Sequence, residues 1–168
     1  FTHMACAMLL EIPNISKNDN YIKQNVISRP FRKLIDSADG ALFNGPPENP
    51  REHIIYASRS LFHGEWKKAL EFLFGANKVW RLIPESEEVQ QVLTKKVKEV
   101  AFKVLMFRNA KFYHSFSIAD LGGLFEVSEG EIVNFVSKLI VREKFAICIN
   151  KEENVVQIGK SGAQGDQE

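Results

Sequence analysis

Residue types that commonly perform catalysis are few in this sequence, and their spacing fits no reactive site. The chain has four histidines, and none has a cysteine or carboxylate at metal-ligand spacing beside it: His3, His53, His63 and His114. There is no pair of histidines in a zinc-protease motif and no Ser/His/Asp arrangement suited to nucleophilic catalysis. We therefore interpret the chain as a non-enzyme with no catalytic residue, no metal site and no cofactor.

One stretch resembles a phosphate-binding motif. Gly159-Lys160-Ser161 matches the end of the glycine-rich loop that surrounds a nucleotide phosphate. That loop needs another glycine at position 154, where Asn154 stands, and a helix directly after it. Residues 160–168 are instead rich in Gly, Gln and Asp, which predicts a disordered tail. The resemblance is therefore rejected.

Positive and negative charges nearly cancel over the whole chain, but they are unevenly distributed along the sequence. The 22 Lys and Arg residues against 21 Asp and Glu residues give a net charge of +1, which excludes a dedicated basic arm for nucleic acid. Residues 15–33 and 95–111 nevertheless carry local charges of +4 and +5. Solvated helix faces would explain this, and the alternative is contact with RNA phosphates. The candidates for RNA contact are Lys95, Lys98, Lys103, Lys111, Arg32 and Lys33.

The first elements that would position these charges are two helices. Residues 1–12 are apolar and lack a capping residue at their start, so we expect a helix cut from a longer protein. Pro13 is expected to end it. Residues 19–36 predict an amphipathic helix that is interrupted near Pro30.

A helical pair and a long helix are expected next. Asn49 and the following proline predict a helix start, and the helix should run to about Phe62 and break at Gly64. A second helix over 65–73 would pack against it and make one helical-repeat unit. Residues 86–108 carry a regular apolar stripe, and Phe102 and Met106 lie off it, which predicts burial on two sides.

The C-terminal third predicts a winged helix. Capping patterns begin at Ser117 and Ser128, and two alternating strands are expected over 145–149 and 155–158. Residues 112–136 contain four acidic residues and no Lys or Arg, a local charge of −4 that would repel a phosphate backbone. We therefore expect this winged helix to bind protein and not DNA. The expected core is Trp66, Leu70, Val97, Val104, Leu121, Phe125, Ile132, Val136, Phe145 and Ile147.

A helical-repeat part joined by a long helix to a winged helix resembles the PCI domain, which occurs in the proteasome lid, the COP9 signalosome and translation initiation factor 3. Three stretches are similar to the C-subunit family of the eukaryotic initiation factor: residues 7–13 (AMLLEIP), 45–53 (GPPENPREH) and 64–67 (GEWK). Lys78-Val79-Trp80 continues the likeness. The fold class that follows is mainly α, with α+β character at the C-terminus: a right-handed helical-repeat bundle over 1–85, and a connecting helix and winged helix with a small β-hairpin over 86–159.

The resemblance implies a scaffold that assembles with other PCI subunits, namely the a and e subunits, and supports binding to the small ribosomal subunit, with rRNA as a candidate contact. No DNA partner is expected because of the acidic charge over 112–136, and no membrane partner because the longest apolar stretch, residues 4–10, is too short to span a bilayer. The two cysteines, which are far apart, fit a reducing, cytoplasmic location in which both behave as small apolar side chains. Two alternatives stay open: an RNA-binding module that uses the basic helix faces, and a subunit of a proteasome-lid-like complex. The residues expected at a PCI–PCI interface are Ala146, Cys148, Val155, Gln157, Glu129 and Glu131.

Overall fold

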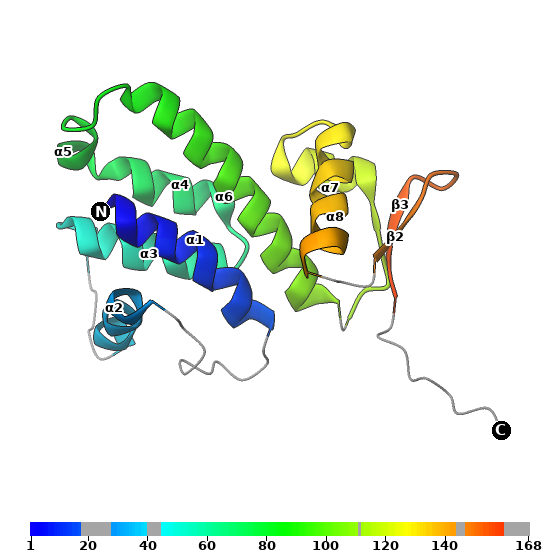
Figure 1. Cartoon of the computed structure of the whole chain (residues 1–168), viewed down its shortest axis with the longest axis horizontal. Helices are drawn as coiled ribbons and strands as arrows, with labels where there is room; N and C mark the ends of the chain where they lie inside the picture. The colour runs from blue at the N-terminus through cyan, green and yellow to red at the C-terminus, as the bar shows by residue number, and fades with distance from the viewer. Residues whose placement is uncertain (18–27, 40–44, 111, 144–146, 160–168) are drawn as a thin grey trace. The chain divides into compact units, whose positions relative to one another are not determined.

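The computed structural model describes residues 1–17, 28–39, 45–110, 112–143 and 147–159 (Figure 1). The chain forms two compact units, Phe1–Arg108 and Asn109–Glu168. The first unit is made of helices, and the second combines two helices with a small sheet. The mainly α class with a small β part at the C-terminus is therefore confirmed. The expected disordered tail, 160–168, lies outside the described residues.

Helix α1 (Thr2–Lys17) contains a proline in its interior. The prediction that Pro13 ends this helix was wrong. A proline inside a helix lacks the N–H for one hydrogen bond and costs about 3 kcal/mol. Helix α1 packs against α3, and Met8 and Ile12 are almost completely buried. Fully burying such side chains stabilises by about 1.5–3 kcal/mol each, which offsets the proline.

Helix α2 (Arg29–Asp39) begins where a break was expected. Pro30 lies in its first turn, where a missing N–H is tolerated because the first N–H groups of a helix have no partner within it. Phe31, Leu34 and Ala38 are buried, whereas Lys33 is exposed. The part of the expected helix at 19–27 lies outside the described residues.

The predicted helical pair is confirmed as α3 (Pro50–Phe62) and α4 (Trp66–Gly75). The Asn49 side chain accepts a hydrogen bond from the Glu52 N–H at 3.0 Å and so caps α3. Between the helices Gly64 has a φ of 80°, a conformation that favours glycine. The two alanines that permit close approach, Ala57 and Ala69, are both fully buried.

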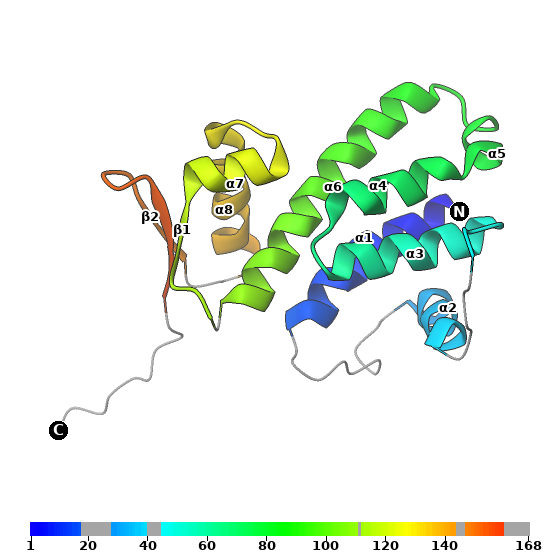
Figure 2. The ribbon, with the colours of Figure 1, turned by 180° about the vertical axis from the view of Figure 1, so that it is seen from behind.

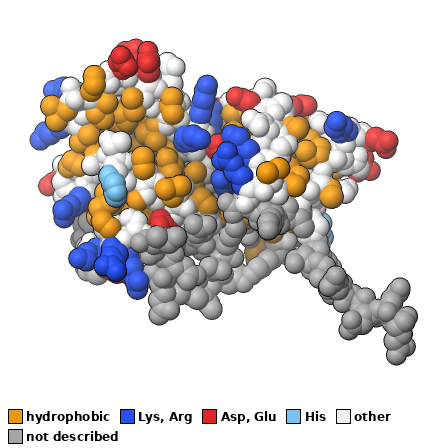
Figure 3. All heavy atoms as spheres, in the orientation of Figure 1, with side chains coloured by type: hydrophobic (Ala, Val, Ile, Leu, Met, Phe, Trp, Pro, Cys, Tyr) orange, Lys and Arg blue, Asp and Glu red, His pale blue; other side chains and the backbone are white. Residues whose placement is uncertain are grey.

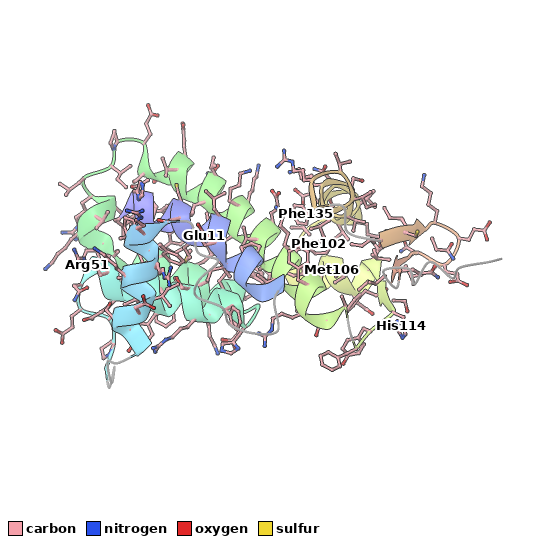
Figure 4. All side chains as sticks on the ribbon, turned by 60° about the horizontal axis from the view of Figure 1, so that its bottom comes forward. Glu11, Arg51, Phe102, Met106, His114 and Phe135 are labelled. Atoms are coloured by element: carbon pink, nitrogen blue, oxygen red, sulfur yellow. The ribbon has the colours of Figure 1, made fainter. Side chains whose placement is uncertain are left out.

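A short helix, α5 (Asn77–Trp80), leads to the long helix α6 (Ser86–Asn109). The apolar stripe of α6 is buried at Val97, Val100 and Val104. The two residues off this stripe, Phe102 and Met106, are also fully buried (Figure 4). The expectation of burial on two sides of this helix is therefore confirmed.

The second unit contains α7 (Ile118–Phe125), α8 (Glu129–Glu143) and three short strands (Figure 2). The strands are β1 (Ser115–Ser117), β2 (Ile147–Asn150) and β3 (Val155–Ile158). They form an antiparallel sheet in the order β1-β3-β2. The sequence predicted only the β2–β3 hairpin. It missed β1 because three residues are too short for an alternating pattern and their partner lies far along the chain.

Local capping explains the two helix starts of this unit. The Ser117 hydroxyl accepts a hydrogen bond from the Asp120 N–H, and Ser128 and Glu131 exchange hydrogen bonds through their side chains and backbone N–H groups. Helix α7 ends in a tight turn, where the Val127 N–H donates to the Gly122 carbonyl oxygen at 3.0 Å. A Cβ atom at Gly122 would lie 3.1 Å from the Val127 carbonyl oxygen, so a larger residue at this position would require the turn to shift by a few tenths of an ångström.

The expected core is confirmed wherever the structure describes it. Nine of its ten residues are buried, and the tenth, Phe145, lies outside the described residues. The cysteines depart from expectation: Cys6 and Cys148 are free thiols, and both side chains are exposed instead of packed as small apolar groups.

Candidate functional site

The sheet of the second unit has one buried and one solvent-facing side. Ile147, Val156 and Ile158 are buried on the inner side. On the outer side, Cys148 and Gln157 are register partners and both are exposed, and Ser115 of β1 pairs with the same Gln157. The structure therefore brings together two of the residues expected at an interface, Cys148 and Gln157, with Val155 on the same strand as Gln157.

The backbone register shows which groups of β2 point outward. The Ile158 N–H donates to the His114 carbonyl oxygen at 2.8 Å, on the β1 side of β3. Ile158 is also the register partner of Ile147, so Ile147 and Ile158 form a non-hydrogen-bonded pair of the antiparallel ladder. The same alternation places Ile149 opposite Val156 in a second such pair. The N–H and C=O groups of Ile147 and Ile149 consequently point away from β3, on the side of β2 where no further strand lies among the described residues; we call this side the open edge of β2.

The hairpin turn holds this edge strand in register. The Asn150 side-chain oxygen accepts hydrogen bonds from the N–H groups of Glu152 and Glu153, at 3.1 and 3.4 Å. Asn154 adopts a left-handed φ of 53°, which asparagine tolerates better than most residues. The short turn therefore fixes the pairing of β2 with β3.

The acidic residues at the start of α8 have different roles. Glu131 belongs to the capping box with Ser128, so its carboxylate accepts the Ser128 N–H at 3.2 Å. Glu129 is exposed in the first turn of the same helix. Among the described residues, the Glu131 side chain therefore serves as a cap, whereas the Glu129 side chain makes no capping hydrogen bond. The remaining candidate, Ala146, lies outside those residues.

The six residues expected to contact RNA are not equivalent. Lys95 is exposed, and the Lys98 ammonium lies 4.8 Å from the centre of the Trp66 ring. The Lys103 ammonium lies 3.9 Å from a Glu99 carboxylate oxygen, and its side chain is only 16% exposed. Glu99 also lies 3.9 Å from the Lys96 ammonium, so the charge of Lys103 is only partly neutralised within α6. Lys111 lies outside the described residues.

The other two RNA candidates, Arg32 and Lys33, lie on α2. Lys33 is exposed and Arg32 is half-buried. In both ribbon views α2 and α6 lie on opposite sides of the helices α1, α3 and α4 (Figures 1 and 2). Among the described residues, the structure therefore does not bring Arg32 and Lys33 of α2 onto one surface with the basic residues of α6.

Sequence reasoning missed two features. The outward backbone groups of Ile147 and Ile149 are independent of side-chain type, so only the register of the third strand reveals them. Arg51 lies in the first turn of α3 and lines a groove together with Lys33. In the sequence Arg51 follows Asn49 and Pro50, a pattern that indicates only a helix start, so no sequence pattern points directly to the groove.

Two further site types are not found in the described parts of the chain. No group of three or more His, Cys, Asp and Glu side chains there could hold a metal ion. Nor does any of the helices described combine the length and apolar character needed to cross a membrane.

Comparison with known proteins gives a consistent result. The chain is 38% identical, over 92% of its length, to a protein of Mycosarcoma maydis that is named as the C subunit of eukaryotic translation initiation factor 3. Proteins with the same name from Chaetomium globosum and Phaeosphaeria nodorum are 36% and 33% identical over the same share. The matched part is only 17–18% of the length of these relatives. No protein-family model matches the chain.

Proposed function

We propose that the chain is a non-catalytic scaffold module of eukaryotic translation initiation factor 3. The premise is that the chain is homologous to a segment of the C subunit of that factor and that its fold is consistent with a PCI domain. In this role it assembles with other PCI subunits, the a and e subunits, and supports attachment to the small ribosomal subunit in the cytoplasm. The relatives named above favour initiation factor 3 over a proteasome-lid-like complex.

The observation that carries the proposal is the open edge of β2. The outward N–H and C=O groups of Ile147 and Ile149 are a template for an additional strand. Adding a strand to an exposed sheet edge is a common way for proteins to associate, because main-chain hydrogen bonds supply affinity. A second PCI subunit would pair with β2 and extend the sheet.

Side chains near this edge would then select the partner. Cys148 lies on the edge strand itself, and Gln157 and Val155 lie on the neighbouring central strand β3, with Gln157 opposite Cys148. Glu129 adds negative charge at the start of α8, and the whole of 112–136 contains no Lys or Arg to compensate it. The favoured partner surface is therefore basic or neutral and offers an extended strand.

Direct RNA contact is a second candidate function. The local charge of +5 over 95–111 favours it, and Lys95 is exposed on α6. The pairing of Lys103 with Glu99 weakens that surface, because one of its cations is partly neutralised within the helix.

The assembly role is tested by mixing the chain with the PCI segments of the a and e subunits. Sedimentation velocity at micromolar concentration is expected to show a complex that sediments faster than any single component. Separate boundaries, with circular dichroism confirming that every component is folded, would contradict the proposed role.

A further inference from the structure

A groove in the first unit has cations on its walls and apolar side chains on its floor. It lies between α1, α2 and the start of α3 and has a volume of about 520 Å³. Lys33 of α2 and Arg51 of α3 line it from two different helices, and Met4, Leu34 and Ile55 contribute apolar surface. Leu34 and Ile55 are each only 7% exposed, so tight packing holds this floor in place.

Neither cation of the groove is neutralised within the described part of the chain. Lys33 and Arg51 are both exposed, and neither makes an ion pair or side-chain hydrogen bond with the residues described there. Figure 3 shows Lys and Arg side chains gathered over α2, and Figure 4 labels Arg51 beside the same helix. Two helices therefore present positive charge to solvent at the groove.

The carboxylate that lines this groove, Glu52, is already engaged. One of its oxygens accepts the Glu48 N–H at 2.7 Å, and the other accepts the Asn49 side-chain N–H at 2.8 Å. These bonds hold Glu52 in the capping structure of α3. The first turn of α3 also contributes the positive end of a helix dipole near Arg51. The groove is therefore complementary to negative charge.

The rest of the lining favours a peptide over a nucleic acid strand. Proteins that bind single strands combine aromatic side chains, on which the bases stack, with a positively charged track along the backbone. No aromatic side chain, and no cation besides Lys33 and Arg51, is among the described residues that line this groove. Its floor is aliphatic instead, and burial on such a surface stabilises an aliphatic side chain. A peptide can carry carboxylates and an aliphatic side chain in one short stretch, so it matches both parts of the lining.

We propose that this groove docks a short acidic segment of a partner protein, in which one aliphatic residue stands between acidic residues. The Arg51 guanidinium offers a planar pair of donors that matches the two oxygens of a carboxylate, and the Lys33 ammonium holds a second carboxylate. The aliphatic side chain rests on Leu34 and Ile55. The groove volume lies within the usual range of ligand sites, so it admits that side chain with its flanking backbone.

This docking is independent of the proposed assembly role. The groove belongs to the first unit and the open edge of β2 to the second, so the acidic segment and a PCI partner would contact different residues. The ion pairs in the groove weaken as salt concentration rises, whereas the apolar contact persists. Both contributions can therefore be measured separately.

The test measures binding of a fluorescein-labelled peptide, Gly-Glu-Asp-Leu-Asp-Glu-Gly, to the whole chain by fluorescence anisotropy. Neutralising both cations in K33Q/R51Q is expected to weaken binding at least about tenfold, because two charge-assisted contacts are lost. The variant K33R/R51K keeps both charges and should retain most of the binding. The matched control is K78Q/R81Q, which removes two exposed cations outside the groove and should bind as the unchanged chain does.

A second peptide tests the apolar floor without altering the chain. Replacing the peptide's leucine by serine leaves its charge unchanged and is expected to weaken binding about tenfold, because the buried aliphatic surface is lost. Equal affinity for the two peptides would overturn the proposal, since it would show that the groove attracts charge alone.

Three further results would overturn the proposal: no saturable binding of the leucine peptide by the unchanged chain, an equal loss in K33Q/R51Q and K78Q/R81Q, or stronger displacement of the labelled peptide by oligouridine than by unlabelled peptide at equal charge concentration. The last would identify nucleic acid as the occupant. The K33Q/R51Q chain is expected to associate with the partner PCI segments as the unchanged chain does. Failure of the unchanged chain to associate, with peptide binding intact, would contradict the assembly role and leave the groove supported.

Discussion

Replacing Trp80 by alanine is expected to lower the free energy of unfolding of the first unit by about 3–5 kcal/mol. Trp80 is only 7% exposed, and its ring meets those of Phe1 and Phe74 edge to face, with centroids 5.9 and 5.7 Å away. Its indole N–H donates to the Leu73 carbonyl oxygen at 2.7 Å. The substitution removes the ring contacts, leaves a cavity and deprives a buried carbonyl group of its donor. Denaturant unfolding followed by far-ultraviolet circular dichroism measures the change.

The control for this substitution is Trp80→Phe, which retains most of the ring but cannot donate to Leu73. It should cost about 1–3 kcal/mol, the usual penalty for leaving a buried polar group unsatisfied. An unfolding midpoint of Trp80→Ala equal to that of the unchanged chain would show that Trp80 does not anchor α5 against α4 as described.

Replacing Ile149 by proline is expected to weaken association with the partner PCI subunit roughly 10- to 100-fold, or about 1.4–2.7 kcal/mol. The Ile149 N–H points along the open edge of β2, away from β3. Proline removes that donor and places its ring where the added strand would approach, but it is tolerated at the edge of a sheet. Titration by isothermal calorimetry measures the effect.

The matched control is Ile149→Ala, which shortens the same side chain and retains the N–H. Because the proposed contact is made by the backbone, the alanine variant should bind the partner more tightly than the proline variant does. Equal weakening by both substitutions would show that the side chain, and not the strand edge, makes the contact. Thermal unfolding of both variants separates a loss of binding from a loss of folding.

Features controlled by neighbouring residues could be predicted from the sequence. Asn49, Ser117 and Ser128 each act within three residues through a side-chain cap, so the starts of three helices followed directly. The buried face of α6 could also be predicted, because its apolar residues recur at helical spacing within the helix itself. The pairing of Glu99 with Lys103 is also local, since the two residues are four positions apart. The net charge summed over residues 95–111 does not show which charges pair, so the pairing was not predicted.

Features that depend on distant residues could not be predicted in this way. Strand β1 exists because Ser115 pairs with Gln157, far along the chain, and its own three residues carry no strand pattern. Pro13 continues a helix because packing on α3 outweighs its local cost. The groove needs Lys33 and Arg51 on two different helices, so it exists only once α2 and α3 are packed together.

The open edge of β2 is tested most directly by hydrogen–deuterium exchange of the chain, free and bound to the PCI segment of its partner subunit. Strand addition predicts that the amides of Ile147 and Ile149 exchange rapidly in the free chain and become protected in the complex. The Ile158 amide, which already donates to His114, should change little. A stable complex in which Ile147 and Ile149 exchange as they do in the free chain would contradict assembly through this edge.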